Sequence, residues 1–366
     1  MKKSKTSNFY HDKPLFGMDI GHGSIKVMQL SEPPHDSGHA SYKPKVIGYG
    51  YTTFDKNAQD GGVIINPEVM AQATLDLFKN RLIGKINTRR VALAIPAYRT
   101  FTRALQIPKL KPSELQEAVE LEAEQYISLP LEELYLDYRV VKQNDEDLEL
   151  FVVAVPKKIV DSYIDFANIL GLEVVLVEPT LSSSGRLFAV GDNSKDPAFI
   201  IDFGTLSCDI SIFDEHTLAM GTVAQGGGAN FTNAIKTTLG VTLEEAGIIK
   251  TRYGLGASKK QKEIREALQP TLTIIVKEIK RMLRYYEERY GQDKPIKQII
   301  TLGGGANMPG LSEYLTGELR MAVRHFDPWQ YLEYKKMKLP DQADRPMYAI
   351  AAGLSLAHPN EVFSND

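Results

Sequence analysis

MDIGHGSIK, from Met18 to Lys26, is followed later in the chain by a near copy of itself, IDFGTLSCD, from Ile201 to Asp209. In both stretches an Asp follows an apolar run, a Gly comes two residues after it, and a Ser comes five residues after it. Apolar residues then resume, so each copy predicts a strand, a tight glycine turn and a second strand. Two such hairpins so far apart predict two similar domains that each contribute one turn to a shared cleft.

Turns of this kind are suited to binding phosphate. Glycine lets the backbone adopt positive φ, so successive N–H groups can point to one side and form a concave anion site. An Asp at the end of the strand can hold Mg²⁺ directly or through water, which is the role we expect for Asp19 and Asp202. Lys26, on the strand after the first turn, can reach back to a terminal phosphate. The second copy has Asp209 instead of a lysine, so the two turns are not equivalent.

A third glycine cluster comes after both hairpins. The segment Ile299–Leu311 reads as an apolar strand that runs into Gly303, Gly304 and Gly305 and then into a helix. Glycines at this place would let a flat ring lie against bare backbone. A single Asp-x-Gly turn is usually only a hairpin, but two of them in register, followed by this cluster, predict a nucleotide cleft.

The composition is that of an ordinary globular protein. The chain has 366 residues, enough for two or three domains, with 43% hydrophobic and 24% charged residues. A net charge of -3 gives no general attraction to nucleic acid, and the seven histidines form no metal pattern. The single cysteine excludes an intramolecular disulfide, no segment reads as membrane-spanning, and the basic N-terminus lacks the apolar core of a secretion signal. We therefore expect a cytoplasmic protein that does not bind nucleic acid.

Between the two hairpins the periodicity predicts a small α+β module. A buried strand from Val91 and an alternating strand over Thr100–Ile107 precede a helix that opens with a capping box at Ser113. Two more strands follow, and a helix near Lys158–Leu170 closes the unit. The order of strand, helix, two strands and helix is typical of an α+β unit.

The rest of the chain is predicted to be more helical. A helix is expected over Pro179–Val190, before the second hairpin, and the run Gly226-Gly227-Gly228 precedes a mainly helical region, 230–290, that contains a second capping box at Thr242. The last helix, 346–357, is expected to return to the first domain.

The order and spacing of the three motifs resemble those of the actin, sugar-kinase and heat-shock ATPase superfamily. Within it, the chain resembles the type IV pilus assembly protein PilM family and, more distantly, the division protein FtsA. The sharper match lies in the module, in EAEQYISLPLEEL from Glu122 to Leu134 and in Leu136-Asp137-Tyr138. The family pattern also matches Val177-Glu178-Pro179 and Leu302–Leu311, and the resemblance extends from about Leu15 to Leu356.

The resemblance implies an α/β fold of the actin type, with two duplicated ribonuclease-H-like domains and an inserted α+β subdomain of the SHS2 type. The implied units are a first domain of residues 14–88, 175–199 and 341–366, an inserted peptide-binding subdomain of residues 89–174, a second domain of residues 200–225 and 295–340, and a helical subdomain of residues 226–294.

The resemblance also implies roles for single residues. Asp19 and Asp202 match the acids on the Mg²⁺ side, and Lys26 matches the lysine that contacts phosphate. The other nucleotide-binding positions are Gly21, His22, Gly23, Ser24, Gly204, Thr205, Leu206, Ser207, Lys250, Gly303, Gly304, Gly305 and Ala306. Glu178 matches the catalytic position at which relatives orient water. Its structural alternative is an acid near a helix N-terminus, with Pro179 as the first helical residue.

PilM-like proteins bind ATP in the cleft between their domains and lie under the inner membrane. They capture the short cytoplasmic N-terminal peptide of the membrane protein PilN, which links the cytoplasmic motors to the periplasmic platform. The resemblance implies the same here, with ATP and Mg²⁺ as cofactors and with a PilN-like peptide, pilus motor ATPases and platform proteins as partners. The implied peptide groove lies between the first domain and the module. Lys85, Arg89 and Arg90 either line that groove or form a solvated basic edge.

Three positions depart from the pattern of active ATPases. His22 replaces a small hydroxyl residue, Leu206 stands where many relatives have Gly, and Gly247 stands where relatives often have an acid for the ribose. These departures favour nucleotide binding over rapid turnover, so we expect at most a slow ATPase.

Two other functions are considered, an FtsA-like division protein and a small-molecule kinase. An FtsA-like protein ends in a basic amphipathic helix, which the sequence does not show at its end. A small-molecule kinase needs a substrate pocket with a catalytic base.

Overall fold

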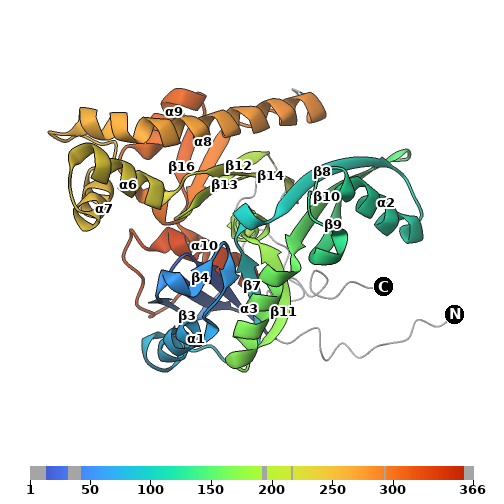
Figure 1. Ribbon diagram of the computed structural model, residues 1–366, viewed down its shortest axis with the longest axis horizontal. Helices are drawn as coiled ribbons and strands as arrows, with labels where there is room; N and C mark the ends of the chain where they lie inside the picture. Colours follow the sequence, from blue (N-terminus) through green and yellow to red (C-terminus); the bar gives the residue numbers. More distant parts are fainter. Residues whose placement is uncertain (1–13, 32–42, 192–195, 216, 292–293, 358–366) are drawn as a thin grey trace.

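The computed structural model describes residues 14–31, 43–191, 196–215, 217–291 and 294–357. The basic N-terminal segment and the residues after 357, on which two expectations from the sequence rest, lie outside this part. The described chain forms two α/β domains, one above the other in Figure 1, with the inserted module at their side.

The first domain is built on a six-stranded sheet with the order β11–β7–β1–β2–β3–β6. Its strands are β1 (Phe16–Gly21), β2 (Ser24–Leu30), β3 (Val46–Thr53), β6 (Ile83–Gly84), β7 (Arg90–Ile95) and β11 (Glu173–Pro179). Strand β1 pairs antiparallel with β2 and parallel with β7. Every residue of β7 is buried, as expected for a central strand covered on both faces.

The second domain repeats the same plan. Its sheet has the order β14–β13–β12–β15–β16, again with an antiparallel hairpin beside a parallel pair. Its strands are β12 (Ala198–Phe203), β13 (Ser207–Asp214), β14 (Thr217–Gln225), β15 (Gln298–Leu302) and β16 (Ala322–His325). Strand for strand, this sheet matches β3–β2–β1–β7–β11, which confirms the predicted duplication.

Helices cover both sheets (Figure 1). The longer ones are α1 (Pro67–Asp76), α3 (Lys157–Ile169), α6 (Gly228–Leu239), α7 (Leu243–Arg252), α8 (Gln261–Tyr290), α9 (Leu311–Leu319) and α10 (Ala349–Ser355). Short segments are β4 (Gln59–Asp60), β5 (Val63–Ile64), a π-turn (Leu77–Arg81) and 3-10 turns at Lys56–Ala58, Ala97–Arg99, Leu131–Glu133, Gly304–Asn307, Pro328–Tyr331 and Arg345–Tyr348. The last helix does return to the first domain, because the Oγ of Ser355 accepts a hydrogen bond from the N–H of Gly17 at 3.1 Å.

The inserted module is smaller than the sequence analysis predicted. It consists of β8 (Phe101–Pro108), α2 (Pro112–Glu124), β9 (Leu134–Gln143) and β10 (Asp147–Pro156), with the sheet order β8–β10–β9. Strand β7 pairs with β1 and β11, and α3 packs on the same sheet, so both belong to the first domain. The boundaries 89 and 174 were therefore wrong and move to about 101 and 156, because periodicity identifies a strand but not the sheet that it joins.

Two local predictions also need correction. Helix α2 begins at Pro112 rather than at Ser113, and the N–H of Lys111 donates to the Glu114 carboxylate at 3.2 Å. The helix expected over Pro179–Val190 is two helices, α4 (Thr180–Ser183) and α5 (Arg186–Gly191), separated at Gly185. A Cβ at Gly185 would lie 2.1 Å from the Phe213 ring, so the chain must pass here without a side chain.

The second capping box is confirmed. The N–H of Glu245 donates to the Thr242 hydroxyl at 3.2 Å, and the Glu245 carboxylate accepts from the Thr242 N–H at 2.8 Å.

Candidate functional site

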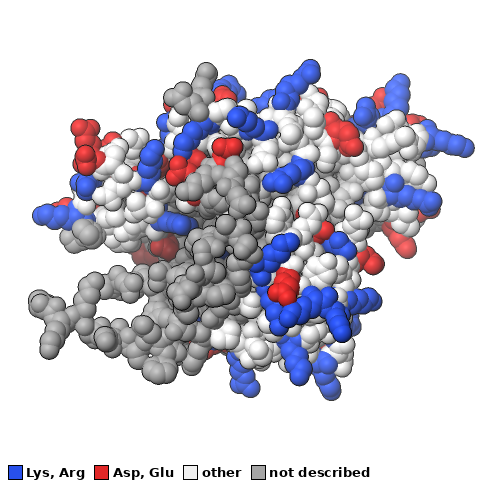
Figure 2. Space-filling view, turned by 180° about the vertical axis from the view of Figure 1, so that it is seen from behind, with Lys and Arg blue, Asp and Glu red and all other residues white. Residues whose placement is uncertain are grey.

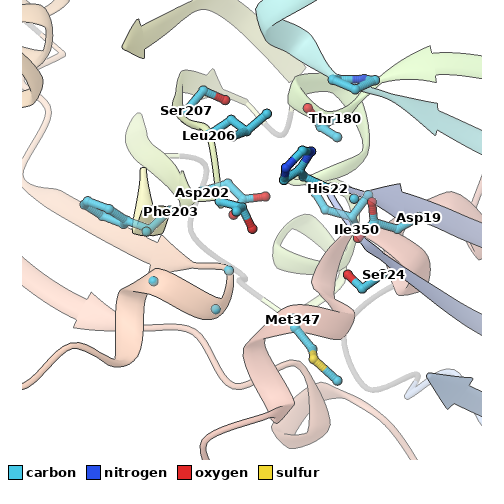
Figure 3. A pocket seen from close by; sticks show the side chains of 18 of the residues that line it. Asp19, His22, Ser24, Thr180, Asp202, Phe203, Leu206, Ser207, Met347 and Ile350 are labelled. Carbon is cyan, nitrogen blue, oxygen red and sulfur yellow. The ribbon is translucent and has the colours of Figure 1, made fainter. Parts of the chain in front are cut away.

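A cavity of about 440 Å³ lies between the two domains, and most of the predicted site residues line it (Figure 3). These are Asp19, Gly21, His22, Ser24, Lys26, Asp202, Gly204, Thr205, Leu206, Ser207, Lys250, Gly303, Gly304 and Gly305. Gly23, Glu178 and Ala306 are not among the described residues of its wall. The two hairpins and the third glycine cluster therefore meet at one place.

The first turn is as short as a hairpin allows. Gly21 pairs with Ser24, which leaves only His22 and Gly23 as the loop. Gly23 has a φ of +88°, a conformation that glycine adopts without strain. The His22 ring projects into the cavity (Figure 3), where burial and then the nearby Lys56 lower the pKa of the imidazole, so the ring is neutral at pH 7.

A buried ion pair bridges the first hairpin. Asp19 and Lys26 occupy paired positions on β1 and β2, and the Lys26 Nζ lies 2.9 Å from the Asp19 Oδ2. Both side chains are close to fully buried, with exposed fractions of 10% and 12%. Both also line the cavity. The ammonium is therefore already in position at the cavity wall, which lowers the entropy that binding an anion would cost.

The second turn is wider and carries two acids. Asp202 and Asp209 occupy paired positions at the base of the turn. The Asp209 carboxylate accepts hydrogen bonds from the Thr180 hydroxyl at 2.5 Å and from the Ser207 hydroxyl at 3.2 Å. Because Thr180 belongs to α4 of the first domain, this bond crosses the cleft and joins the two domains next to the cavity.

Burial and neighbouring carboxylates raise the pKa of Asp202 and of Asp209. Burial, then Asp209 and Asp19, raise the pKa of Asp202 to about 8, although Lys26 opposes this change. Burial also raises the pKa of Asp209 to about 6, against the effect of its two hydroxyl partners. With all three carboxylates charged, the site would hold more negative charge than Lys26 and Lys250 neutralise. A divalent cation between the carboxylates would stabilise their charged forms.

The donor set fits Mg²⁺ with phosphate rather than a metal held by protein alone. Among the described residues, no three His, Cys, Asp or Glu side chains come together in a way that could hold a metal ion. Mg²⁺ usually keeps several waters and takes one or two carboxylates together with substrate phosphates. Asp19 and Asp202 provide those carboxylates at the cavity wall.

The raised pKa of Asp202 predicts how stability depends on pH in the absence of ligand. Its ordinary pKa is 3.8, so between about pH 4 and pH 8 the folded protein holds a proton that the unfolded chain has lost. The free energy of unfolding should therefore fall as pH rises from 6 to 8, by at most about 1.4 kcal/mol per pH unit from this group. Asp202→Asn should remove this part of the slope. Urea denaturation at pH 6, 7 and 8 measures it, and equal slopes in wild type and Asp202→Asn would contradict the account.

The third glycine cluster is shaped around the second hairpin. Gly303 has a φ of +82°, and a Cβ there would lie 2.0 Å from the Asp202 Oδ1. A Cβ at Gly305 would lie 2.9 Å from Phe203. A Cβ at Gly304 would meet no atom within 4 Å. Gly303 and Gly305 thus let this segment touch β12, whereas Gly304 presents open backbone at the cavity wall.

The start of α6 completes the wall on the side of the second domain. The N–H of Gly228 donates to the Gly204 carbonyl and the N–H of Ala229 to the Thr205 carbonyl, each at 2.9 Å. The Lys250 Nζ donates to the Gly228 carbonyl at 2.9 Å, and burial lowers the pKa of this lysine. Lys250, which the sequence analysis expects to contact the nucleotide, therefore lies at the cavity wall.

Several residues of the cavity wall were not predicted from the sequence. They include Tyr51, Tyr98, Thr180, Asp209, Gly228, Ala229, Met347 and Ile350. The run Gly226-Gly227-Gly228 before a helix was a usable signal, because a Cβ at Gly227 would lie 2.6 Å from the Gly204 carbonyl oxygen. Thr180, Met347 and Ile350 gave no local signal in the sequence, since only the fold brings them to the site.

The geometry favours the structural interpretation of Glu178 over the catalytic one. Its carboxylate accepts two hydrogen bonds from the Arg186 guanidinium, one of them at 2.6 Å, and the side chain is nearly buried. Pro179 is the last residue of β11 and the N-cap residue of α4 rather than its first helical residue, so Glu178 lies beside a helix N-terminus and is held there by the ion pair with Arg186.

Arg90 does not line an open groove, because only 5% of it is exposed at the start of β7. Lys85 and Arg89 are exposed.

Two like sheets that present an acid and a glycine turn to one cavity, with a third glycine cluster beside them, define the actin-like ATPase fold. The chain is similar over 94% of its length to 98% of a chain in a PilM–PilN type IV pilus biogenesis complex, with a TM-score of 0.80 and 23% identity. It is similar over 93% of its length to 88% of the ethanolamine utilization protein EutJ from Carboxydothermus hydrogenoformans, with a TM-score of 0.51 and 14% identity. The same share of the chain matches 95% of MreB 5 of Spiroplasma citri bound to AMPPNP, with a TM-score of 0.51 and 13% identity. These likenesses confirm the predicted fold class.

A family model narrows this class further. The model of the type IV pilus assembly protein PilM matches residues 17–358, and the chain belongs to that family. The match favours a role in type IV pilus assembly over the FtsA-like division protein and the small-molecule kinase, which the sequence analysis also considers. Within the part of the chain that the structure describes, no helix has the length and apolar character needed to cross a membrane.

Proposed function

We propose that this protein is a scaffold of type IV pilus assembly that holds Mg-ATP in its cleft and captures the cytoplasmic N-terminal segment of a PilN-like membrane protein. The observation that carries the proposal is the cavity between the domains, where two duplicated turns, a preformed lysine and three carboxylates meet. Family membership supports the pilus assembly role.

Different residues of the cavity would bind different parts of the nucleotide. The backbone of the two turns and Lys26 would hold the phosphates, and Asp19 and Asp202 would hold Mg²⁺ through its waters. Gly304 would lie under the adenosine, with Lys250 beside it. MreB 5, which shares this fold, was solved with AMPPNP bound. Because Arg186 occupies both oxygens of Glu178, we expect binding with little or no turnover.

The junction between the module and the first domain suits an extended peptide. Strand β9 is an edge of the module sheet, and Tyr135 near its start is 46% exposed. The Tyr135 hydroxyl donates to the Asp161 carboxylate of α3 at 3.0 Å, and the Lys157 Nζ lies 5.5 Å from the centre of the ring. An edge strand offers backbone bonds to an added strand, and an exposed aromatic ring offers apolar contact. The solved chain with a TM-score of 0.80 comes from a complex with PilN.

A place beneath the inner membrane is consistent with the surface charge. Seen from behind, Lys and Arg gather over the lower right of the molecule, where the first domain lies (Figure 2). Anionic lipid headgroups attract such a surface. We propose that the peptide partner provides the main attachment and that this charge orients the protein.

A peptide titration tests the proposal. A labelled synthetic peptide with the N-terminal cytoplasmic residues of the neighbouring pilus membrane protein is titrated with the full chain, and fluorescence anisotropy is read. We expect saturable binding that Tyr135→Ala weakens by about tenfold, since exposed tyrosines are frequent binding anchors. Tyr253→Ala, at an exposed tyrosine of the second domain, is the control and should bind as wild type does. Absence of binding at high micromolar concentrations, with and without Mg-ATP, would contradict the proposal.

A further inference from the structure

The outer edge of the first-domain sheet carries a group of exposed cations. Strand β6 is the outermost strand of this sheet, at the end opposite β11. The π-turn Leu77–Arg81 and the segment 334–338 pack around it. The exposed cations of these three segments, together termed the basic edge, are Lys79, Arg81, Lys85, Lys335, Lys336 and Lys338.

The π-turn directs its apolar side chains inward and its cations outward. Leu77 is fully buried, and the half-buried Phe78 packs on the core of the first domain. Gly50 of β3 permits this packing, because a Cβ there would lie 2.7 Å from the Leu77 Cδ1. Lys79 and Arg81 are therefore exposed beside β3. A π-turn is a rare element that is frequently found at functional sites.

The segment 334–338 is fixed against β3 and β6. The Tyr49 hydroxyl of β3 donates to the Lys338 carbonyl. Met337 touches Gly84 of β6, where an added Cβ would lie 2.6 Å from the Met337 Cε. Lys335 has a φ of +46°, a conformation that residues with a side chain rarely adopt. Cations from parts of the chain that are far apart in sequence are thus held side by side at one edge.

The basic edge has few acidic partners. The Arg81 Nε lies 2.6 Å from the Asp76 Oδ2, and the Lys335 Nζ lies 3.6 Å from the Glu333 Oε1. Among the residues that the structure describes, the other four cations have no carboxylate at ion-pair distance. The chain as a whole has a net charge of -3, so the positive charge is local. It agrees with the gathering of Lys and Arg over the first domain in Figure 2.

The chemistry of this edge favours an anionic lipid surface over a nucleic acid. Single-stranded nucleic acid stacks its bases on exposed aromatic rings. The rings that the π-turn and the segment 334–338 provide, Phe78 and Tyr334, are half-buried. Lysine suits a membrane surface, because its apolar stem can lie along the protein while its ammonium reaches the headgroups. Anionic lipids attract such residues over about one Debye length.

We propose that the basic edge docks directly on an anionic membrane, with its lysines on the phosphates of the lipid headgroups. The docking gives the protein a second attachment besides the peptide and determines which side of the first domain faces the bilayer. The inference rests on the proposed function for the place of the protein beneath a membrane. The lipid contact itself needs neither the peptide nor a nucleotide.

Co-sedimentation with lipid vesicles tests the docking. The full chain is mixed with phosphatidylcholine vesicles that contain either no phosphatidylglycerol or about one third of it, and the bound fraction gives a partition coefficient. Binding to the anionic vesicles should exceed binding to the neutral ones by at least about tenfold. It should fall severalfold when the salt concentration rises from about 0.1 M to about 1 M. Equal binding to both kinds of vesicle would overturn the inference.

A triple variant locates the contact. The substitutions Lys79→Gln, Lys85→Gln and Lys336→Gln remove one cation from each segment and should lower the partition coefficient by at least about tenfold. The matched control is the triple variant Lys259→Gln, Lys277→Gln and Arg284→Gln, which removes the same charge from exposed positions of the second domain. It should bind within about twofold of wild type. An equal loss in both triple variants would mean that general charge causes the binding, which would overturn the inference.

Two more measurements separate the possible failures. The basic-edge triple variant should bind the peptide as wild type does, because β6 and β11 lie at opposite ends of the sheet. Lipid binding by a protein that does not bind the peptide would support the inference and contradict the proposed function. Peptide binding without lipid binding would overturn the inference alone. A labelled DNA duplex that binds more tightly than the anionic vesicles, at equal phosphate concentration, would overturn the choice of a lipid surface.

Discussion

Gly303→Ala should abolish nucleotide binding and lower the free energy of unfolding by more than about 2 kcal/mol. An alanine there would have to keep a φ of +82°, and its Cβ would lie 2.0 Å from the Asp202 Oδ1. A movement of the Asp202 side chain alone cannot make room for the new Cβ, because this atom would also lie 2.9 Å from the backbone carbonyl oxygen of Phe203. Either the third glycine cluster moves away from β12 or Asp202 leaves its position. Both outcomes disrupt the cavity. Urea denaturation and Mg-ATP titration measure the two effects.

Gly304→Ala is the matched control for this prediction. Its Cβ would meet no atom within 4 Å, and its φ lies outside the left-handed region, so stability should stay within about 0.5 kcal/mol of wild type. Nucleotide affinity should still fall, because the new methyl group would project where a ring would lie on bare backbone. Wild-type stability and binding in Gly303→Ala would refute the role assigned to this cluster, and unchanged affinity in Gly304→Ala would place the ring elsewhere.

Lys26→Ala should weaken Mg-ATP binding by about 10- to 100-fold, the size expected for the loss of one charge-assisted bond to phosphate. The ammonium is held in the cavity wall by Asp19, so little ordering is needed when phosphate arrives. Removing the ammonium also leaves less positive charge beside the carboxylates of Asp19, Asp202 and Asp209, which further opposes the binding of an anion. Calorimetric titration of both proteins with Mg-ATP gives the ratio directly.

Lys56→Ala provides the charge control. Lys56 lies near the first turn, where it lowers the pKa of His22, but it is exposed and is not among the described residues of the cavity wall. Removing it should change affinity by less than about threefold, since exposed charges act weakly. If both lysine variants weaken binding equally, general electrostatic attraction explains the result and Lys26 has no specific role.

The twin turns could be predicted from the sequence because their geometry is local. An acid at a strand end and glycine at a tight turn depend on neighbouring residues, and the register of both hairpins agrees with that expectation. Lys26 was predictable for the same reason, because its pairing with Asp19 follows from the hairpin. The link between Asp209 and Thr180 was not, since the two residues lie on different domains and only the fold brings them together.

The errors in the sequence analysis have a common physical origin. Apolar alternation marks β7 as a strand, but its partners β1 and β11 lie far away in the chain, so the module boundary could not be derived from the pattern. Glu178 has its partner eight residues later, across a break between two helices that the packing of Gly185 against Phe213 produces. Such residues take their role from tertiary contacts that periodicity does not report.

The twin turns are thus the walls of one cavity, and the central claim is that they hold one Mg-nucleotide between them. Titration calorimetry of the wild-type protein with ATP, in the presence of Mg²⁺ and then with the metal chelated, tests this claim most directly. The account predicts one site per chain and an affinity that falls by at least about tenfold without Mg²⁺, because Asp19, Asp202 and Asp209 then face the phosphates without a bridging cation. No binding at millimolar ATP, or equal affinity with and without Mg²⁺, would contradict it.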